Sequence, residues 1–340
     1  MKIAVMSFAH VHSQVYVRLL GSDPSIEVMT SDPLYSSRPQ HETGGAAMAA
    51  DLEVPYVDTY SELMAWGPDG VIICSENSRH REDVELAAAA GAQILCEKPI
   101  ATTLDDASAM IRTCEQAGVK LMIAYPVRYS PSFVALREAC DAGVLGSLRG
   151  LHGANNGGVP ADRRAWFVDP KMSCGGSLID HVVHLADLYD ELLGHLPAES
   201  VYAAANGRMP GAPVGVETAA QVSVRYPGGI VATIDSSWLV PKHAPTWGGL
   251  ILDVIGAQGF ASMDAFNQRV DGYSELEQRP VWLSYGVNLD TIMVETFVDV
   301  VRTGAIPPVD GAAGYRSMAV ALAALESVRT GQPAEVGSLG

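Results

Sequence analysis

Residues 71–107 read VIICSENSRHREDVELAAAAGAQILCEKPIATTLDDA, and this stretch decides the fold. It contains two short apolar runs, VIIC and QILC, on either side of an alanine-rich segment with helical patterning. Neither run alternates apolar and polar residues, so we expect helices to cover both faces of each strand. The pattern predicts a β-α-β unit of a parallel sheet.

The same alternation continues on both sides of this stretch, from the N-terminus to about residue 124. It predicts an α/β fold whose N-terminal domain, residues 1–124, is a doubly wound, Rossmann-like parallel sheet that binds a dinucleotide. The expected strands are Lys2–Ser7, Ile26–Ser31, Gly70–Cys74, Ala92–Cys96 and Val119–Ala124. The expected helices are Val11–Leu20, Glu42–Asp51, Arg79–Ala90 and Asp105–Ala117.

Residues 125–340 have a different pattern and are predicted to form an α+β domain for substrate binding and oligomerisation. Period-2 runs dominate residues 200–285, where a Pro-Gly-Gly turn at 227–229 joins two strands into a hairpin. This region predicts a large, mostly antiparallel, open sheet. An irregular stretch is expected at HGANNGGVPADRRAW (152–166), and helices are expected at Pro131–Ala142, Gly176–Leu193, Thr291–Thr303 and Ala312–Arg329.

The composition is that of an ordinary globular chain of 340 residues, enough for two domains. Twenty-two basic against 39 acidic residues give a net charge of −17, which disfavours binding to nucleic acid or to an anionic membrane. Five widely spaced cysteines without a CxxC pair are typical of a reduced compartment. The start, MKIAVMSFAH, indicates a first strand rather than a signal peptide. We therefore expect a cytoplasmic protein without membrane spans.

The first turn of the predicted sheet departs from the dinucleotide-binding pattern. The usual G-x-G-x-x-G follows strand one, but the glycine positions here hold Ser7, Ala9 and His12. One reading is that the turn binds nothing, because glycine permits close approach to the pyrophosphate. The other is that small side chains and the free amides of a helix starting near Val11 still bind the anion. The sequence leaves both open.

The pair His10-x-His12 in this turn raises the question of a metal, because imidazoles are common metal ligands. In a turn that enters a helix, the two rings need not converge on one point. No CxxC or HExxH frame supplies further ligands. We therefore expect no metal, and instead expect His12 to pack under the cofactor or over the substrate.

Strand two is expected to end at Asp32, 25 residues after Ser7. An acidic residue at about this spacing accepts the adenosine ribose hydroxyls and indicates NAD. Arg38 follows closely and could instead bind the 2′-phosphate of NADP. A third reading is that Asp32 and Pro33 form only a turn.

Two further groups have the chemistry of a dehydrogenase site. Lys98 follows a buried strand and precedes Pro99, which cannot continue a central strand, so the lysine is expected at the carboxyl edge of the sheet. Asp180 and His184 are four residues apart and share one face of a predicted helix. The alternatives are a surface lysine paired with Glu97 and an ordinary helix contact.

Three blocks in order resemble the Gfo/Idh/MocA oxidoreductases. They are residues 71–107, where a strand-end Asn and a His precede E-K-P, residues 123–150, IAYPVRYSPSFVALREACDAGVLGSLRG, and residues 175–188, GGSLIDHVVHLADL. The resemblance implies the two-domain fold and catalytic roles for Lys98, Asp180 and His184. The glycine-free first turn is the departure from the family pattern.

Pattern and resemblance together assign the remaining site residues, and no metal is among the assignments. The expected cofactor-binding residues are Ser7, Phe8, Ala9, His10, His12, Asp32, Ser75, Asn77, His80, Glu97, Lys98 and Arg128. The expected substrate-binding residues are Tyr125, Asn155, Arg164, Trp166, Asp180, His181 and His184, of which His181 is expected to narrow the pocket.

The reading is an NAD(P)-dependent oxidoreductase acting on a CH–OH group of a sugar, cyclitol or related polyhydroxy substrate. Two alternatives stay open: a ligand-sensing or partner-binding protein without turnover, and a lyase or hydrolase that oxidises its substrate only transiently. We also expect a homodimer or homotetramer formed through the open sheet, because one uncovered face would expose more apolar surface than monomers usually do.

Overall fold

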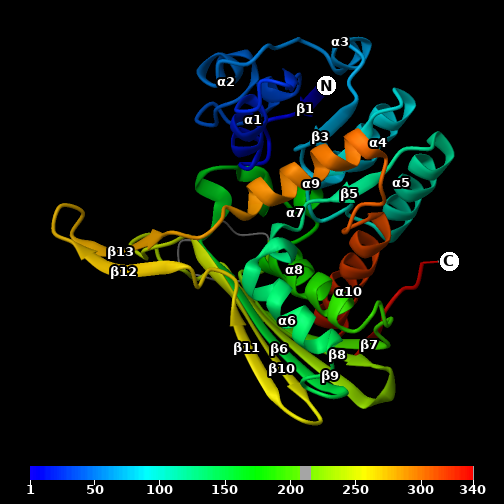
Figure 1. Ribbon diagram of the computed structural model, residues 1–340, viewed down its shortest axis with the longest axis vertical. Coiled ribbons are helices and arrows are strands. Elements are labelled where there is room, and N and C mark those ends of the chain that lie inside the picture. Colours follow the sequence, from blue (N-terminus) through cyan, green and yellow to red (C-terminus); the bar gives the residue numbers. More distant parts are fainter. Residues whose placement is uncertain (207–215, 340) are drawn as a thin grey trace. The chain divides into compact units, whose positions relative to one another are not determined.

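The computed structural model describes residues 1–206 and 216–339 (Figure 1). The chain divides into two compact units. Unit 1 comprises Met1–Tyr125, Ala161–Cys174 and Asp290–Tyr315, and unit 2 comprises Pro126–Pro160, Gly175–Leu289 and Arg316–Gly340. The expected division after residue 124 gives two consecutive stretches. The compact units differ from it, because two later segments of the chain pack with the first stretch.

In the described part of unit 1, five parallel strands form a sheet in the order β2-β1-β3-β4-β5. The doubly wound sheet predicted from the sequence is thus confirmed. From β1 the chain first forms β2 on one side of that strand and then returns to form β3 on its other side. The strand order therefore reverses between β1 and β3, and such switch points are where these sheets bind ligands. The strands are β1 (Lys2–Met6), β2 (Glu27–Ser31), β3 (Gly70–Ile73), β4 (Gln93–Cys96) and β5 (Leu121–Ile123).

Helices cover this sheet, as the unbroken apolar strands require. All four residues of β3 are buried, and α9 packs against that strand so closely that a β-carbon at Gly70 would lie 2.7 Å from Val301. Thr103 begins α5 by accepting a hydrogen bond from the Asp106 amide. The helices are α1 (Ser13–Gly21), α2 (Gly45–Asp51), α3 (Tyr60–Ala65), α4 (His80–Ala89), α5 (Leu104–Ala117), α7 (Pro170–Ser173) and α9 (Leu289–Thr303).

In unit 2, the described residues place seven strands in one sheet with the order β11-β10-β6-β9-β8-β7-β14. Only the β6 and β9 pair is parallel among these, so the prediction of a mostly antiparallel sheet is confirmed. The strands are β6 (Leu148–Gly157), β7 (Ser200–Asn206), β8 (Ala219–Tyr226), β9 (Ile230–Ser237), β10 (Gly248–Gly256), β11 (Phe260–Asp264) and β14 (Ala334–Glu335).

Strand β6 corrects the expectation of an irregular stretch beginning at residue 152. Its glycines weaken the strand pattern, but they face large side chains. A β-carbon at Gly153 would lie 2.4 Å from Leu185, and one at Gly157 would lie 2.4 Å from Trp247. Packing therefore selects glycine here and overrides its low strand propensity.

Helices α6 (Pro131–Asp141) and α8 (Ser177–Leu192) pack on one face of this sheet (Figure 1). Strands β12 (Arg269–Ser274) and β13 (Arg279–Ser284) form a separate ribbon, so the expectation of one sheet up to residue 285 is wrong at its end. Helix α10 spans Gly311–Thr330. Of the helices in the described ranges, none is long and apolar enough to cross a membrane.

Candidate functional site

The first turn of unit 1 shows how a chain without glycine makes this bend. Ser7 follows β1 with φ 69°, the left-handed conformation that glycine adopts most readily. Its hydroxyl donates to Asp32 Oδ1 (3.1 Å) and accepts from the Ala9 amide (3.0 Å) and from Arg38 Nη2 (2.8 Å). These three hydrogen bonds, which a glycine could not form, offset the strain of the left-handed backbone at Ser7.

Three backbone amides of this turn have acceptors inside the protein. The Ala9 amide donates to Ser7 Oγ, the His10 amide to the Cys74 carbonyl (2.8 Å) and the His12 amide to His10 Nδ1 (3.3 Å). Helix α1 begins at Ser13, two residues later than expected. A pyrophosphate at this turn would compete with the acceptors of these three amides, whereas no side chain caps the start of α1.

The segment 161–174 belongs to unit 1 and binds the same turn. Arg164 Nε and Trp166 Nε1 both donate to the Ala9 carbonyl (2.9 and 3.0 Å), and Arg164 Nη2 donates to the Phe8 carbonyl (3.1 Å). Burial lowers the pKa of Arg164. Both residues were predicted to contact substrate, and the structure shows that they hold the first turn.

Asp32 directly follows β2, as predicted, and does more than form a turn. Its carboxylate accepts hydrogen bonds from Ser7, from Arg38 Nη1 and Nη2 (2.9 and 2.8 Å) and from the Gly45 amide (3.0 Å). Arg38 Nε also bonds Glu76 (3.2 Å). Burial alone would lower the pKa of Arg38, but the two carboxylates raise it above its ordinary value. Arg38, the residue that could bind the 2′-phosphate of NADP, is thus bonded to the carboxylates of Asp32 and Glu76.

The residues that follow β3 and β4 tie together loops at the carboxyl edge of the sheet. Asn77 Nδ2 donates to the Ser173 carbonyl (3.0 Å). The His80 ring lies 2.9 Å from the Pro99 carbonyl and 3.3 Å from the Ser75 carbonyl, and burial lowers its pKa. Lys98 is at this edge, as predicted, and is buried.

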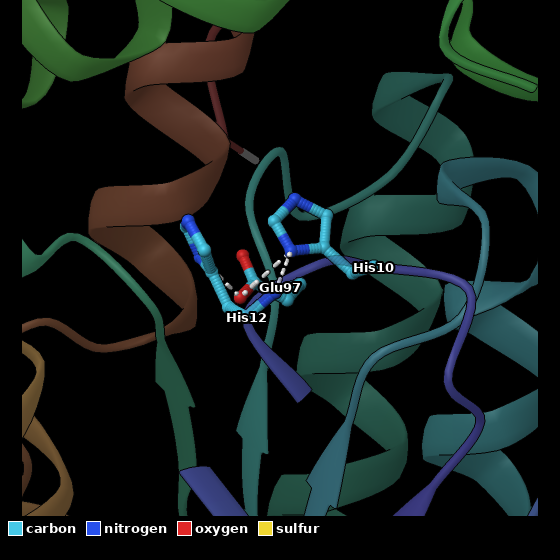
Figure 2. Close-up of side chains that lie close together, drawn as sticks. All are labelled: His10, His12 and Glu97. Atoms are coloured by element: carbon cyan, nitrogen blue, oxygen red, sulfur yellow. Dashed lines mark hydrogen bonds and ion pairs between the residues drawn. The ribbon is translucent and has the colours of Figure 1, made fainter. Parts of the chain in front are cut away.

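His10, His12 and Glu97 form a compact cluster with His10 and Glu97 buried and His12 partly exposed, and the Glu97 carboxylate lies beside both rings (Figure 2). Glu97 Oε1 lies 3.3 Å from His10 Nδ1 and 3.0 Å from His12 Nδ1, and it accepts from the Tyr16 hydroxyl (2.7 Å). Burial raises the pKa of Glu97, but the two histidines outweigh burial and hold it below its ordinary value. For His12, burial lowers the pKa and the carboxylate raises it, with a net rise.

This convergence corrects the interpretation that the two rings need not meet. The cluster also contains Tyr16, which the sequence reading missed. The available signal was its position four residues after His12, on the same face of α1.

In unit 2, Glu217 determines how α8 begins. Its Oε1 accepts from the amides of Gly176 (2.7 Å) and Leu178 (3.0 Å), so a carboxylate caps the positive end of the helix. A β-carbon at Gly176 would lie 1.9 Å from the Glu217 carbonyl oxygen. The sequence contains no local signal for this cap, because the two residues are 41 positions apart.

Asp180 lies on the first turns of α8 and is fixed by two neighbours. Its Oδ2 accepts from Trp238 Nε1 (3.0 Å) and lies 3.2 Å from His181 Nε2. His181 Nδ1 lies 3.0 Å from the Asn155 carbonyl, and its ring packs at 86° to that of Trp247. His181 is therefore a buried partner of Asp180. The two tryptophans are contacts that the sequence reading missed.

Arg128, predicted to bind the cofactor, lies in a buried ion cluster of unit 2. Its Nε and Nη2 donate to Asp187 Oδ2 and Oδ1 (2.7 and 2.9 Å), and its Nη1 bonds Glu191. These contacts indicate a structural role for Arg128. Tyr125 is also buried, at the end of the first segment of unit 1.

Two family models match the chain in succession. Residues 35–125 match the oxidoreductase family model with an NAD-binding Rossmann fold, and residues 133–262 match the GFO/IDH/MocA C-terminal domain. The chain belongs to the Gfo/Idh/MocA oxidoreductase family. The family predicted from the three sequence blocks is confirmed.

Curated Gfo/Idh/MocA relatives include enzymes that act on sugars and cyclitols. The chain is 28% identical to 1,5-anhydro-D-fructose reductase of Ensifer adhaerens, over 86% of this chain and 87% of the relative. It is 28% identical to inositol 2-dehydrogenase of Rhizobium meliloti, over 76% of this chain and 78% of the relative. The fold is similar to that of GenD2 from gentamicin A biosynthesis, solved in complex with NAD, with a TM-score of 0.86, 22% identity and coverage of 99% and 97%.

Unit 1 is thus the NAD-binding Rossmann domain of a Gfo/Idh/MocA protein, and its residues can be compared with the needs of that cofactor. Asp32 stands at the end of β2, where ribose hydroxyls are bound, and Lys98 stands at the end of β4. Both positions fit the dinucleotide. The first turn fits its pyrophosphate less well, because three of its amides already have acceptors.

Proposed function

We propose that the chain is an NAD-dependent dehydrogenase or reductase that acts on a CH–OH group of a sugar, cyclitol or related polyhydroxy compound. The observation that carries the proposal is Lys98, buried at the carboxyl edge of the parallel sheet inside a segment that matches the family's NAD-binding model. The relatives that act on an anhydro sugar and on inositol support the substrate class.

The proposed roles follow from the chemistry of the side chains. NAD, when bound, would supply the acceptor for a hydride from the substrate carbon. Lys98 hydrogen-bonds and polarises the substrate hydroxyl oxygen, and His184 accepts the hydroxyl proton as that carbon is oxidised. Asp180, held by Trp238, is proposed to contact a neighbouring hydroxyl and to orient His184 from the same helix face.

A spectrophotometric assay tests this function. The purified protein is incubated with NAD and a panel of aldoses, anhydro sugars and cyclitols, and NADH formation is followed. We expect net NADH with at least one polyol. NAD binding without NADH formation on any member would favour the sensing alternative. Conversion of a substrate without net NADH would favour the lyase or hydrolase reading.

The choice of cofactor gives a separate prediction. Because Asp32 and Glu76 neutralise Arg38 and would repel a 2′-phosphate, we expect kcat/KM to be at least about tenfold higher with NAD than with NADP. The measurement is steady-state kinetics with both cofactors. Arg79, a half-exposed neighbour that also pairs with Glu76, supplies the control variant Arg79→Ala, which should keep the preference. A clear preference for NADP would show that Arg38 is released to bind the phosphate.

The outer face of the unit 2 sheet supports a proposed homodimer or homotetramer. Val231, Ile251 and Ile255 point away from the helices and are 45%, 43% and 49% exposed. We expect light scattering to show an oligomer, and Ile251→Glu to shift it toward the monomer, because a charge in an apolar interface is costly. Ile306, 77% exposed in unit 1, provides the control Ile306→Glu, which should leave the mass unchanged. A monomeric wild type would refute the proposed interface.

A further inference from the structure

We propose that His10, His12 and Glu97 bind a divalent transition-metal ion such as Zn²⁺. Across residues 1–206 and 216–339, these are the one group of three His, Cys, Asp or Glu side chains whose ligand atoms all lie within 4.8 Å of one another. Two imidazoles and a carboxylate are a common protein ligand set for zinc. The inference goes beyond the proposed dehydrogenase function and does not depend on it.

The contacts of His10 show why a cation suits this position. When the ring is neutral, its Nδ1 accepts a hydrogen bond from the His12 amide (3.3 Å), and in that form the nitrogen offers a lone pair. The same nitrogen faces Glu97 Oε1 at 3.3 Å, and a carboxylate oxygen is also an acceptor. Two hydrogen-bond acceptors without a proton between them do not bond to each other, whereas a metal ion between them accepts an electron pair from each. The 3.3 Å bond to the amide is long and would be given up readily.

The spacing of the ligand atoms agrees with this. Ligands about 2.0 to 2.1 Å from a tetrahedral zinc ion lie about 3.3 Å from one another. The separations from Glu97 Oε1 to the two histidine Nδ1 atoms are 3.3 and 3.0 Å. All three ligand atoms lie within 4.8 Å of one another, and both rings lie beside the carboxylate (Figure 2).

Neighbouring groups orient the carboxylate, as outer-shell partners do in metal sites. The Tyr16 hydroxyl donates to Glu97 Oε1 (2.7 Å), and the Lys98 amide donates to Oε2 (3.2 Å). Besides the three ligands, the charged groups that act on His12 are Asp290 and Lys98, which have opposite signs, so the negative charge that the site itself offers to a cation is the Glu97 carboxylate.

The set provides three protein ligands, and a tetrahedral ion takes four. The His12 side chain is 32% exposed, so water or a ligand oxygen can reach a fourth position from that side. An ion with an open position binds and polarises an oxygen atom. The structure assigns this site to unit 1 alone, since all three ligands belong to it.

Metal content measured without substrate or nucleotide tests the proposal. The full chain is stripped with a chelator, dialysed against Zn²⁺ and then against buffer, and analysed by inductively coupled plasma mass spectrometry. We expect about one zinc ion per chain, and a higher melting temperature with Zn²⁺ present, because a ligand that binds the folded state stabilises it. Co²⁺ loaded in the same way should give the visible absorption of a tetrahedral site.

The variants His12→Gln and Glu97→Gln should each lose the ion and the rise in melting temperature. His12→Gln alters a partly exposed side chain, so it tests the site even if Glu97→Gln fails to fold, which circular dichroism would show. The matched control is His152→Gln, because His152 is exposed on β6 and bonded to Thr233; it should keep the ion. A wild-type chain without zinc, zinc retained by folded His12→Gln, or zinc lost from His152→Gln would each overturn the proposal.

Discussion

Replacing His184 with alanine is expected to reduce turnover by roughly a hundredfold to ten-thousandfold, the usual range for a general acid–base group. NAD affinity should change much less, because His184 belongs to unit 2, whereas Asp32 and Lys98, which we propose to contact NAD, belong to unit 1. Lys98→Ala should lower turnover by a similar factor, because the substrate oxygen would lose its polarising partner. Steady-state kinetics on the best polyol, with calorimetric titration of NAD, measure both effects.

Asp180→Asn is the mildest substitution in this series. The amide keeps the shape of the side chain and can still accept from Trp238, but it lacks the negative charge beside the His181 imidazole. Its turnover should fall by a smaller or equal factor. The control is His152→Ala, which removes an exposed histidine elsewhere in unit 2 and should keep normal turnover. If His184→Ala turns over at a near-normal rate, the assignment of the proton acceptor is wrong.

Asp32→Ala is expected to have the largest effect on stability and on NAD binding together. The substitution removes a carboxylate that accepts four hydrogen bonds, and it leaves the Arg38 side chain, 5% exposed, with Glu76 as its one remaining anionic partner in the described part of the chain. Breaking a buried ion pair from one side costs about 3 kcal/mol or more. The unfolding free energy from urea denaturation should fall by about that amount, and NAD binding should weaken because the ribose loses its acceptor.

Two further variants separate the charge from the side chain. Asp32→Ala combined with Arg38→Met should recover part of the stability, because no buried cation then lacks its partner, but should not recover NAD binding. Asp299→Ala breaks an exposed pair with Arg302 and should cost below about 0.5 kcal/mol. An Asp32→Ala protein as stable as the wild type would show that the Asp32 and Arg38 pair contributes little to folding.

The parallel sheet and its functional edge could be predicted from the sequence because these features repeat locally. Strands buried on both faces show unbroken apolar runs, and each of the five predicted strands lies within two residues of an observed one at both ends. The carboxyl ends of such strands lie at one edge of the sheet, so the positions of Asp32 and Lys98 followed from the strand boundaries. The ordered family blocks added the expected roles.

Three features of the candidate site depended on tertiary structure. Strand β6 is rich in glycine, and only the side chains opposite Gly153 and Gly157 explain that choice. The left-handed turn at Ser7 is stabilised by Asp32 and Arg38, which come from the neighbouring strand end and the loop after it. The cap of α8 comes from Glu217, 41 residues beyond Gly176.

By itself, the sequence determined the order of the elements, the two-sided burial of the first sheet and the residues at its carboxyl edge, because each of these leaves a pattern within a few neighbouring residues. Only the tertiary structure decided that His10, His12 and Glu97 meet. Glu97 follows β4 and lies 85 residues after His12, and β3 lies between β1 and β4 in the sheet. Their distance is set by strand order, register and the course of two turns, and no local periodicity reports those quantities.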